Sequence, residues 1–183
     1  MMQDISLHIL DLVQNSIVAS ASLIEIAIKD IPEQKQLSVM IRDNGRGMDE
    51  NEIIHVTDPF YTTRTTRRVG LGIPLFKASA EASGGYMEIQ SNKGIGTNIK
   101  AVFDNSHIDC LPIGKMEETM AALIFCNPDV NFTYTHQYAD KQFILNTSEI
   151  REQLGELTIA HPQVIGWITE YIIDGLNEIY GGV

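Results

Sequence analysis

The six residues from Asp43 to Met48, Asp-Asn-Gly-Arg-Gly-Met, constrain the fold of this chain more than any other stretch. They follow an alternation of apolar and polar residues over 37–42, which predicts a half-buried strand. Two glycines after a strand permit positive φ and let another molecule approach the backbone closely. The Asp43 carboxylate can accept a hydrogen bond from an amino group. The stretch therefore predicts either a binding edge of a sheet or an ordinary strand-to-helix turn with a solvated Asp43.

A first helix is predicted over residues 4–21, where apolar residues recur at the 3.6-residue spacing. Asp4 is expected at its N-cap, and His8 is expected to pack inside. Asp11 and Asn15 are four residues apart, so they share a face beside the apolar stripe. An amide oxygen there can ligate Mg²⁺, and a carboxylate one turn earlier can orient or deprotonate a water. The alternative is a solvated pair on an exposed helix face.

A hydroxyl-rich loop with three arginines, residues 58–68, leads into Gly70-Leu71-Gly72 and a helix expected from Ile73 to about Ser83. A helix N-terminus carries unpaired N–H groups and about half a positive charge, so this segment predicts an anion site. Glycines at a helix start and arginines in a loop are common, so neither is specific alone. Gly94-Ile95-Gly96-Thr97 is likewise most often a plain hairpin turn.

The elements predicted over residues 1–105 run helix, two strands, helix, loop, helix, two strands. The paired strands are expected as hairpins over 23–42 and 86–103. A chain of right-handed βαβ units would alternate single strands with helices, so this order favours an α+β fold, a two-layer α/β sandwich. The composition changes after residue 105. Residues 106–183 are predicted to form either a small acidic α+β domain or an extension packed on the sheet, with no motif that indicates a role.

Several expectations concern side chains of this C-terminal segment. Thr147 or Ser148 is expected to cap a short helix, and Pro162 is expected in the first turn of the last one. The expected exposed hairpin residues are Phe132, Tyr134 and Phe143, and the expected surface or capping histidines are His55, His107, His136 and His161. The last helix carries an apolar stripe, expected to be core with partner binding as the alternative: Trp167, Ile168, Tyr171, Ile172 and Leu176.

The chain of 183 residues has a formal net charge of −11. Residues 106–183 hold 3 Lys+Arg against 11 Asp+Glu, so most of the negative charge lies there. This acidity argues against nucleic acid or an anionic membrane as the main partner. Cys110 and Cys126 form no CxxC pair and suit a reduced compartment. Because no stretch has the character of a signal peptide or a membrane span, a cytoplasmic location is expected.

In combination the motifs are specific, because they follow one another in a fixed order. In that order they resemble the N, G1, F, G2 and G3 boxes of the GHKL superfamily, whose members share the Bergerat ATP-binding fold. The superfamily covers sensor histidine kinases, anti-sigma-factor serine kinases, type II topoisomerases, MutL-type repair proteins and heat-shock chaperones. The resemblance extends over residues 3–104 and is nearest to the histidine-kinase and anti-sigma-factor-kinase branch. The motifs are Asp11-x-x-x-Asn15, Asp43-x-Gly45-x-Gly47, Pro59-Phe60-Tyr61-Thr62-Thr63-Arg64, Gly70-Leu71-Gly72-Ile73 and Gly94-x-Gly96-Thr97.

The resemblance implies a site for ATP or ADP with Mg²⁺ in residues 1–105. It implies Asp11 as the catalytic base, although most of the family has Glu there, and Asn15 as the Mg²⁺ ligand. Asp43 is implied to accept a hydrogen bond from the adenine amino group, with Thr97 supporting it through water. The other nucleotide-binding residues that it implies are Ala19, Gly45, Gly47, Met48, Phe60, Thr63, Arg64, Gly70, Leu71, Gly72 and Ile73.

Three functions are compatible with this resemblance. Since no upstream helix with a phosphoacceptor histidine is present in the sequence, we expect a regulatory protein kinase that acts in trans on a serine or histidine of a partner protein. The alternatives are an ATP-gated protein-interaction module and a weak ATPase. An ATPase of the repair or chaperone kind would need a lysine from a second domain, where only Lys115 and Lys141 are available. A homodimer remains open.

Overall fold

The computed structural model of the protein describes residues 2–56 and 71–181. The helices are α1 (Ile5–Val18), α2 (Glu50–His55), α3 (Gly72–Ala82), α4 (Met116–Cys126), α5 (Thr147–Leu154) and α6 (Pro162–Ile179). The strands are β1 (Leu23–Ile31), β2 (Gln36–Asp43), β3 (Tyr86–Asn92), β4 (Gly96–Asp104), β5 (Asn131–Tyr138) and β6 (Lys141–Asn146), with a short 3₁₀ turn at Pro32–Gln34 between β1 and β2.

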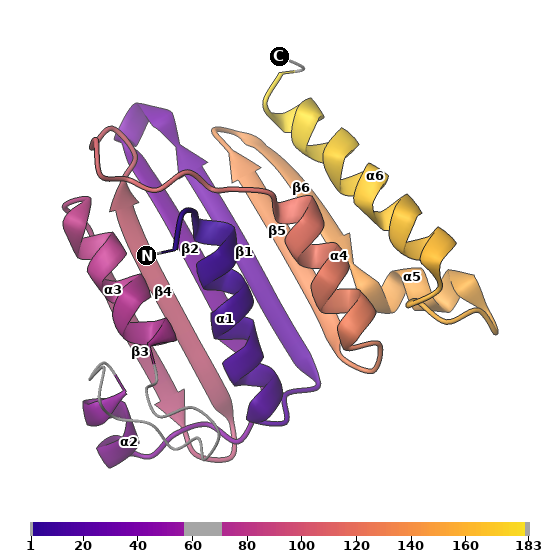
Figure 1. Ribbon diagram of the computed structural model, residues 1–183, viewed down its shortest axis with the longest axis horizontal. Helices are drawn as coiled ribbons and strands as arrows, with labels where there is room; N and C mark the ends of the chain where they lie inside the picture. Colours follow the sequence, from indigo (N-terminus) through magenta and orange to yellow (C-terminus); the bar gives the residue numbers. More distant parts are fainter. Residues whose placement is uncertain (1, 57–70, 182–183) are drawn as a thin grey trace.

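The strands form one sheet in the order β3-β4-β2-β1-β5-β6. Helices α1, α3, α4 and α6 lie on one face of it, as Figure 1 shows, so the predicted two-layer α+β sandwich is confirmed. The hairpins β1–β2 and β3–β4 are antiparallel, and β2 also pairs antiparallel with β4. This register places Asp43, the last residue of β2, opposite Thr97 of β4.

The core lies between the sheet and the helices. The alternation in β1 and β2 sends Ile24, Ile26 and Ile28 from one strand, and Val39 and Ile41 from the other, into it. Burial of each such side chain contributes about 1.5–3 kcal/mol relative to exposure. In the part of the chain that the structure describes, no helix has the length and apolarity to cross a bilayer.

Helix α1 is held at its N-terminus by two different segments. Asp4 is the N-cap, as predicted, and its carboxylate accepts a hydrogen bond from the Leu7 N–H at 3.0 Å. The N–H groups of Ile5 and Ser6 donate to the carbonyls of residues 112 and 113, at 2.9 and 2.8 Å. The segment that leads into α4 therefore supplies partners for amides that no helical carbonyl can reach.

Beyond β4, the chain continues the same sheet. Strand β5 pairs with β1 in parallel, and β6 pairs with β5 antiparallel. The expected exposure of Phe132, Tyr134 and Phe143 is wrong: all three are buried, because β5 and β6 turn one face toward α6.

His136 is also buried, against expectation, on the inward face of β5. The Tyr134 hydroxyl lies 2.6 Å from its Nδ1 and the Tyr180 hydroxyl 2.9 Å from its Nε2. Burial lowers the pKa of His136 to about 4 and raises that of Tyr180 to about 12. A neutral imidazole offers one donor and one acceptor, so it can serve both hydroxyls without a charge.

The two C-terminal helices begin at capping residues that were only partly predicted. Asn146 caps α5 rather than Thr147 or Ser148, and the Thr147 hydroxyl instead accepts a hydrogen bond from the Phe132 N–H at 2.8 Å. His161 caps α6, as expected of a capping histidine. The apolar stripe of α6 is divided: two members are buried in the core, Ile168 and Ile172, and two are exposed, Trp167 and Tyr171.

Candidate nucleotide-binding site

Two polar residues of α1, Asp11 and Asn15, lie beside the start of α3. A Cβ added at Gly72 would be 2.2 Å from Asp11 Oδ2 and 3.7 Å from Asn15 Nδ2. Only glycine lets α3 begin this close to the carboxylate. The N-cap residue, Leu71, makes no side-chain hydrogen bond to the first turn. The structure therefore brings a carboxylate and an amide next to a helix N-terminus, a position that favours anions.

Asp43 ends β2 with both carboxylate oxygens hydrogen-bonded. The Ser16 hydroxyl donates to Oδ2 at 2.7 Å, and the Gly45 N–H donates to Oδ1 at 2.9 Å. Ser16 is 4% exposed, so this contact is shielded from water. Both bonds fix the plane of the carboxylate, and each of its oxygens can accept a further hydrogen bond.

The turn after Asp43 packs tightly against its neighbours. A Cβ at Gly45 would lie 2.8 Å from the Ala19 carbonyl oxygen, and a Cβ at Gly47, where φ is +63°, would lie 2.0 Å from the Asn92 carbonyl oxygen. Between them the Arg46 N–H donates to the Ala19 carbonyl at 2.9 Å. The protein's own backbone is thus a sufficient reason for glycine at both positions.

A chain of hydroxyl contacts joins this turn to the β3–β4 hairpin. The Ser91 hydroxyl donates to the Gly96 carbonyl at 2.9 Å and accepts from the Met48 N–H at 2.8 Å. The Thr97 hydroxyl lies 2.8 Å from Ser91 Oγ. Because the Ser91 proton is already given to Gly96, Thr97 is the donor in that contact. Ser91 therefore links the backbone of Met48 to the side chain of Thr97, which lies opposite Asp43 in the sheet.

His8 lies on the buried face of α1, one turn before Asp11. Its ring packs against Phe76 with centroids 5.3 Å apart, and its Nε2 lies 3.2 Å from Ser79 Oγ. Burial lowers the pKa of His8, while the charges of Asp11 and Asp4 oppose that shift. Within residues 2–56 and 71–181 its Nδ1 has no hydrogen-bond partner. The prediction of a packed histidine is confirmed.

The remaining candidates divide into placed and unplaced residues. Ile73 is buried and Leu71 is 44% exposed at the start of α3. Phe60, Thr63, Arg64 and Gly70 lie outside the described residues, and their roles remain predictions. Among the described residues no group of three or more His, Cys, Asp or Glu could hold a metal ion.

Sequence reasoning missed two hydroxyl residues that organise this region, Ser16 and Ser91. Ser16 is a polar residue on the apolar stripe of α1, a position where a hydroxyl needs a buried partner. Ser91 lies on the same face of β3 as Met87 and Ile89, two partly buried residues that pack against the core. In both cases the sequence shows a hydroxyl on a face that is expected to be buried, but it does not show which group forms the hydrogen bond.

Comparison with known proteins identifies the class. Residues 3–107, more than half of the chain, match the family described as histidine kinase-, DNA gyrase B-, and HSP90-like ATPase. The chain belongs to this family of ATP-binding domains. The predicted membership of the GHKL superfamily is therefore confirmed.

Two relatives are sensor proteins by name. The chain is 33% identical over 97 residues to a putative sensor protein of Shewanella frigidimarina, covering 52% of this chain and 15% of the relative. It is 29% identical over 97 residues to the sensor histidine kinase YvrG of Bacillus subtilis, covering 51% and 17%. The chain thus spans less than a fifth of the length of either relative.

One solved structure shows the same fold. The crystal structure of the N-terminal domain of a DNA repair protein aligns with a TM-score of 0.55 and 17% identity, covering 79% of this chain and 53% of the other.

Proposed function

We propose that the protein binds ATP with Mg²⁺ and transfers the γ-phosphate to a serine or histidine of a partner protein. The single observation that carries this proposal is the meeting of Asp11 and Asn15 with the start of α3 at Gly72. Membership of the family indicates that the ligand is ATP. These residues offer an anion site with a base beside it.

At the adenine end, Asp43 accepts a hydrogen bond from the amino group of the base. Ser16 and Gly45 already hold its carboxylate in one plane, so little freedom is lost when the base binds. Thr97 supports the same amino group through a water, since it lies opposite Asp43 in the sheet register. Met48 and Ala19 border the base.

At the phosphate end, the amide oxygen of Asn15 would hold Mg²⁺. This ion keeps several waters and is completed by substrate phosphates, so a site with one protein ligand fits it without a cluster of carboxylates. When bound, Mg²⁺ neutralises charge on the phosphates. The N–H groups at the start of α3 bind phosphate oxygens, with Phe60, Thr63, Arg64 and Gly70 completing the site.

Asp11 acts as the base toward the attacking hydroxyl or imidazole. Its side chain is one methylene shorter than the usual Glu, and its place against Gly72 brings the carboxylate close to the start of α3. The name of one relative, a sensor histidine kinase, favours phosphoryl transfer over the alternatives, and the name of the other, a putative sensor protein, favours a role in signalling. The free thiols Cys110 and Cys126 suit the cytoplasmic location that such a role would have.

A second candidate function is an ATP-gated interaction module. The observation in its favour is that the carbonyls of residues 112 and 113 cap α1, the helix that carries Asp11 and Asn15. A shift of α1 on nucleotide binding would therefore reach the C-terminal segment. The weak-ATPase alternative has less support, because Lys115 pairs with Glu118 at 2.6 Å and Lys141 donates to the Glu178 carbonyl at 3.3 Å.

Binding is tested by isothermal calorimetry with ATP and Mg²⁺. Asp43→Asn should lose affinity worth about 1–3 kcal/mol, since the amide offers one acceptor oxygen in place of two. Asp140→Asn, the same change in the exposed β5–β6 turn, should bind like the wild type. Equal affinity of wild type and Asp43→Asn refutes the assigned position of the adenine.

Transfer is tested with γ-labelled ATP, alone and with cell extract. A discrete protein should become labelled with the wild type and not with Asp11→Asn. Acid lability of the product distinguishes phosphohistidine from phosphoserine. If no protein is labelled while ATP binds normally, the kinase proposal is rejected and the gated module is retained.

A further inference from the structure

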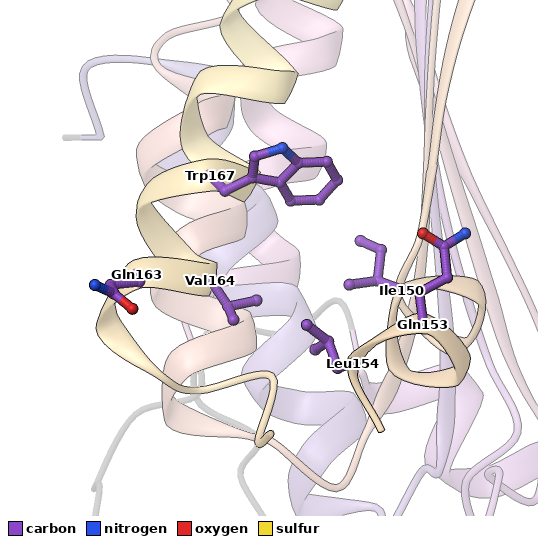
Figure 2. A pocket seen from close by; sticks show the side chains of 6 residues that line it. All are labelled: Ile150, Gln153, Leu154, Gln163, Val164 and Trp167. Atoms are coloured by element: carbon purple, nitrogen blue, oxygen red, sulfur yellow. The ribbon is translucent and has the colours of Figure 1, made fainter. Parts of the chain in front are cut away.

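A groove lies between the two C-terminal helices, away from the nucleotide-binding site. It has a volume of about 320 Å³, and we call it the α5–α6 groove. Figure 2 shows that the Trp167 indole extends from α6 toward α5, with Val164 and Leu154 below it. The lining residues are Ile150, Gln153, Leu154, Gln163, Val164 and Trp167.

The aromatic side of this groove is unusually exposed. Trp167 is 51% exposed and stacks on Tyr171, with ring centroids 5.2 Å apart and planes inclined by 9°. Tyr171 in turn rests on Phe143 of β6 at 5.3 Å, so the core supports the stack from below. Large aromatic residues held rigidly at the surface are enriched at the centres of protein interfaces.

The part of the chain that forms the groove, α5 and α6 with the turn between them, is acidic. Residues 147–183 contain six acidic residues, all exposed, against one basic residue, Arg151. The Arg151 guanidinium donates to the Asn131 side chain and to backbone carbonyls, one of them that of Val130 at 2.8 Å. The guanidinium is therefore engaged by the segment that leads into β5. The acidic residues are Glu149, Glu152, Glu156, Glu170, Asp174 and Glu178.

We propose that the α5–α6 groove binds an amphipathic, basic segment of a partner protein. Apolar side chains of that segment would fill the groove against Trp167, Val164 and Leu154, and its Lys and Arg residues would face the exposed carboxylates that α5 and α6 carry. The volume is at the lower end of the roughly 300–1,000 Å³ of ligand pockets, which suits a few side chains. A second copy of this chain fits less well, because two acidic segments would repel each other.

The groove provides its own reporter, since Trp167 is the only tryptophan of the chain. The probe is a synthetic peptide with leucine at positions i, i+3, i+4 and i+7 and lysine elsewhere. It should change the Trp167 emission in a saturable manner, and the affinity should fall with salt. Peptides with glutamate in place of lysine, or serine in place of leucine, should not produce this change.

A matched pair of variants locates the binding. Gln153→Lys adds a positive charge to the groove lining, and Gln34→Lys makes the same change at the exposed β1–β2 turn. Gln153→Lys should weaken peptide binding roughly tenfold or more, and Gln34→Lys should leave it near the wild-type value. Both positions are exposed, so both variants should keep the wild-type melting temperature.

Several outcomes overturn the proposal. Unchanged Trp167 emission, equal binding of the serine-substituted peptide, or equal weakening by both variants would show that the groove does not recognise this class of segment. An emission that depends on protein concentration without peptide would point to self-association instead. Because peptide binding is measured without ATP, its failure leaves the proposed kinase function untouched.

Discussion

The substitution Gly72→Ala tests the contact on which the proposed chemistry depends. The added Cβ would lie 2.2 Å from Asp11 Oδ2 and 3.2 Å from its Cγ. Ordinary van der Waals contact begins at about 3.4 Å, so the carboxylate must move away by about 1 Å. It is the flexible end of a side chain, and it can move without displacing α1.

The expected loss follows from that displacement. Misplacing a catalytic group by about 1 Å can reduce the rate by about 10²-fold, which corresponds to about 2.7 kcal/mol in the barrier. Alanine is a better helix former than glycine by up to about 1 kcal/mol, so α3 should persist. Gly72→Ala should therefore transfer phosphate slowly while it folds normally and binds ATP within a few-fold of the wild type.

The assay is a double-mutant cycle on phosphoryl transfer or ATP turnover. In an Asp11→Ala background the carboxylate is absent, so adding Gly72→Ala should cost almost nothing further. Full additivity of the two losses would refute the reasoning, because it would show that Gly72→Ala acts on the backbone of α3 rather than through Asp11. Normal turnover of the single variant would refute it as well.

Two further predictions concern the stability of the fold. Burial holds the pKa of His136 at about 4 against 6.5 in the unfolded chain, so this contribution is complete above pH 6.5 and falls by about 3 kcal/mol as the pH drops to 4. Urea unfolding at pH 7.5 and 5.0 should show the loss, with a smaller one in His136→Gln, and an equal pH dependence of both proteins would contradict it. Gly96→Ala places a Cβ 1.9 Å from the Asp43 carbonyl oxygen at φ +135°, whereas Gly94→Ala at φ +78° meets nothing within 4 Å. Urea unfolding should therefore show a loss of about 3 kcal/mol or more for Gly96→Ala and about 1 kcal/mol for Gly94→Ala, and similar losses would exclude the steric explanation.

Local sequence signals predicted most of the elements. The alternation in β1 and β2, the Asp4 cap and the first-turn Pro162 each depend on a few neighbouring residues, and each appears in the structure as expected. Apart from the cap of α5, which is one residue earlier than predicted, the errors lie where a residue's partner is distant in sequence. The alternation of Phe132 and Tyr134 indicates that one face of the strand differs from the other, but not that α6 covers it.

The candidate site shows the same division. The order of the motifs from Asp11 to Thr97 identified the family, because motif order and spacing can be read directly from the sequence. The hydrogen bond from Ser16 to Asp43 was not predicted, since it joins residues 27 positions apart.

By itself, therefore, the sequence determined the class of protein, the strands and the helices, which depend on local spacing. Only the tertiary structure decided that Asp11 meets Gly72, that β5 joins β1 in parallel, and that Trp167 remains exposed on α6. Each of these depends on which surfaces pack together. An apolar face in the sequence predicts that the face will be buried, but it does not predict which helix or strand will cover it.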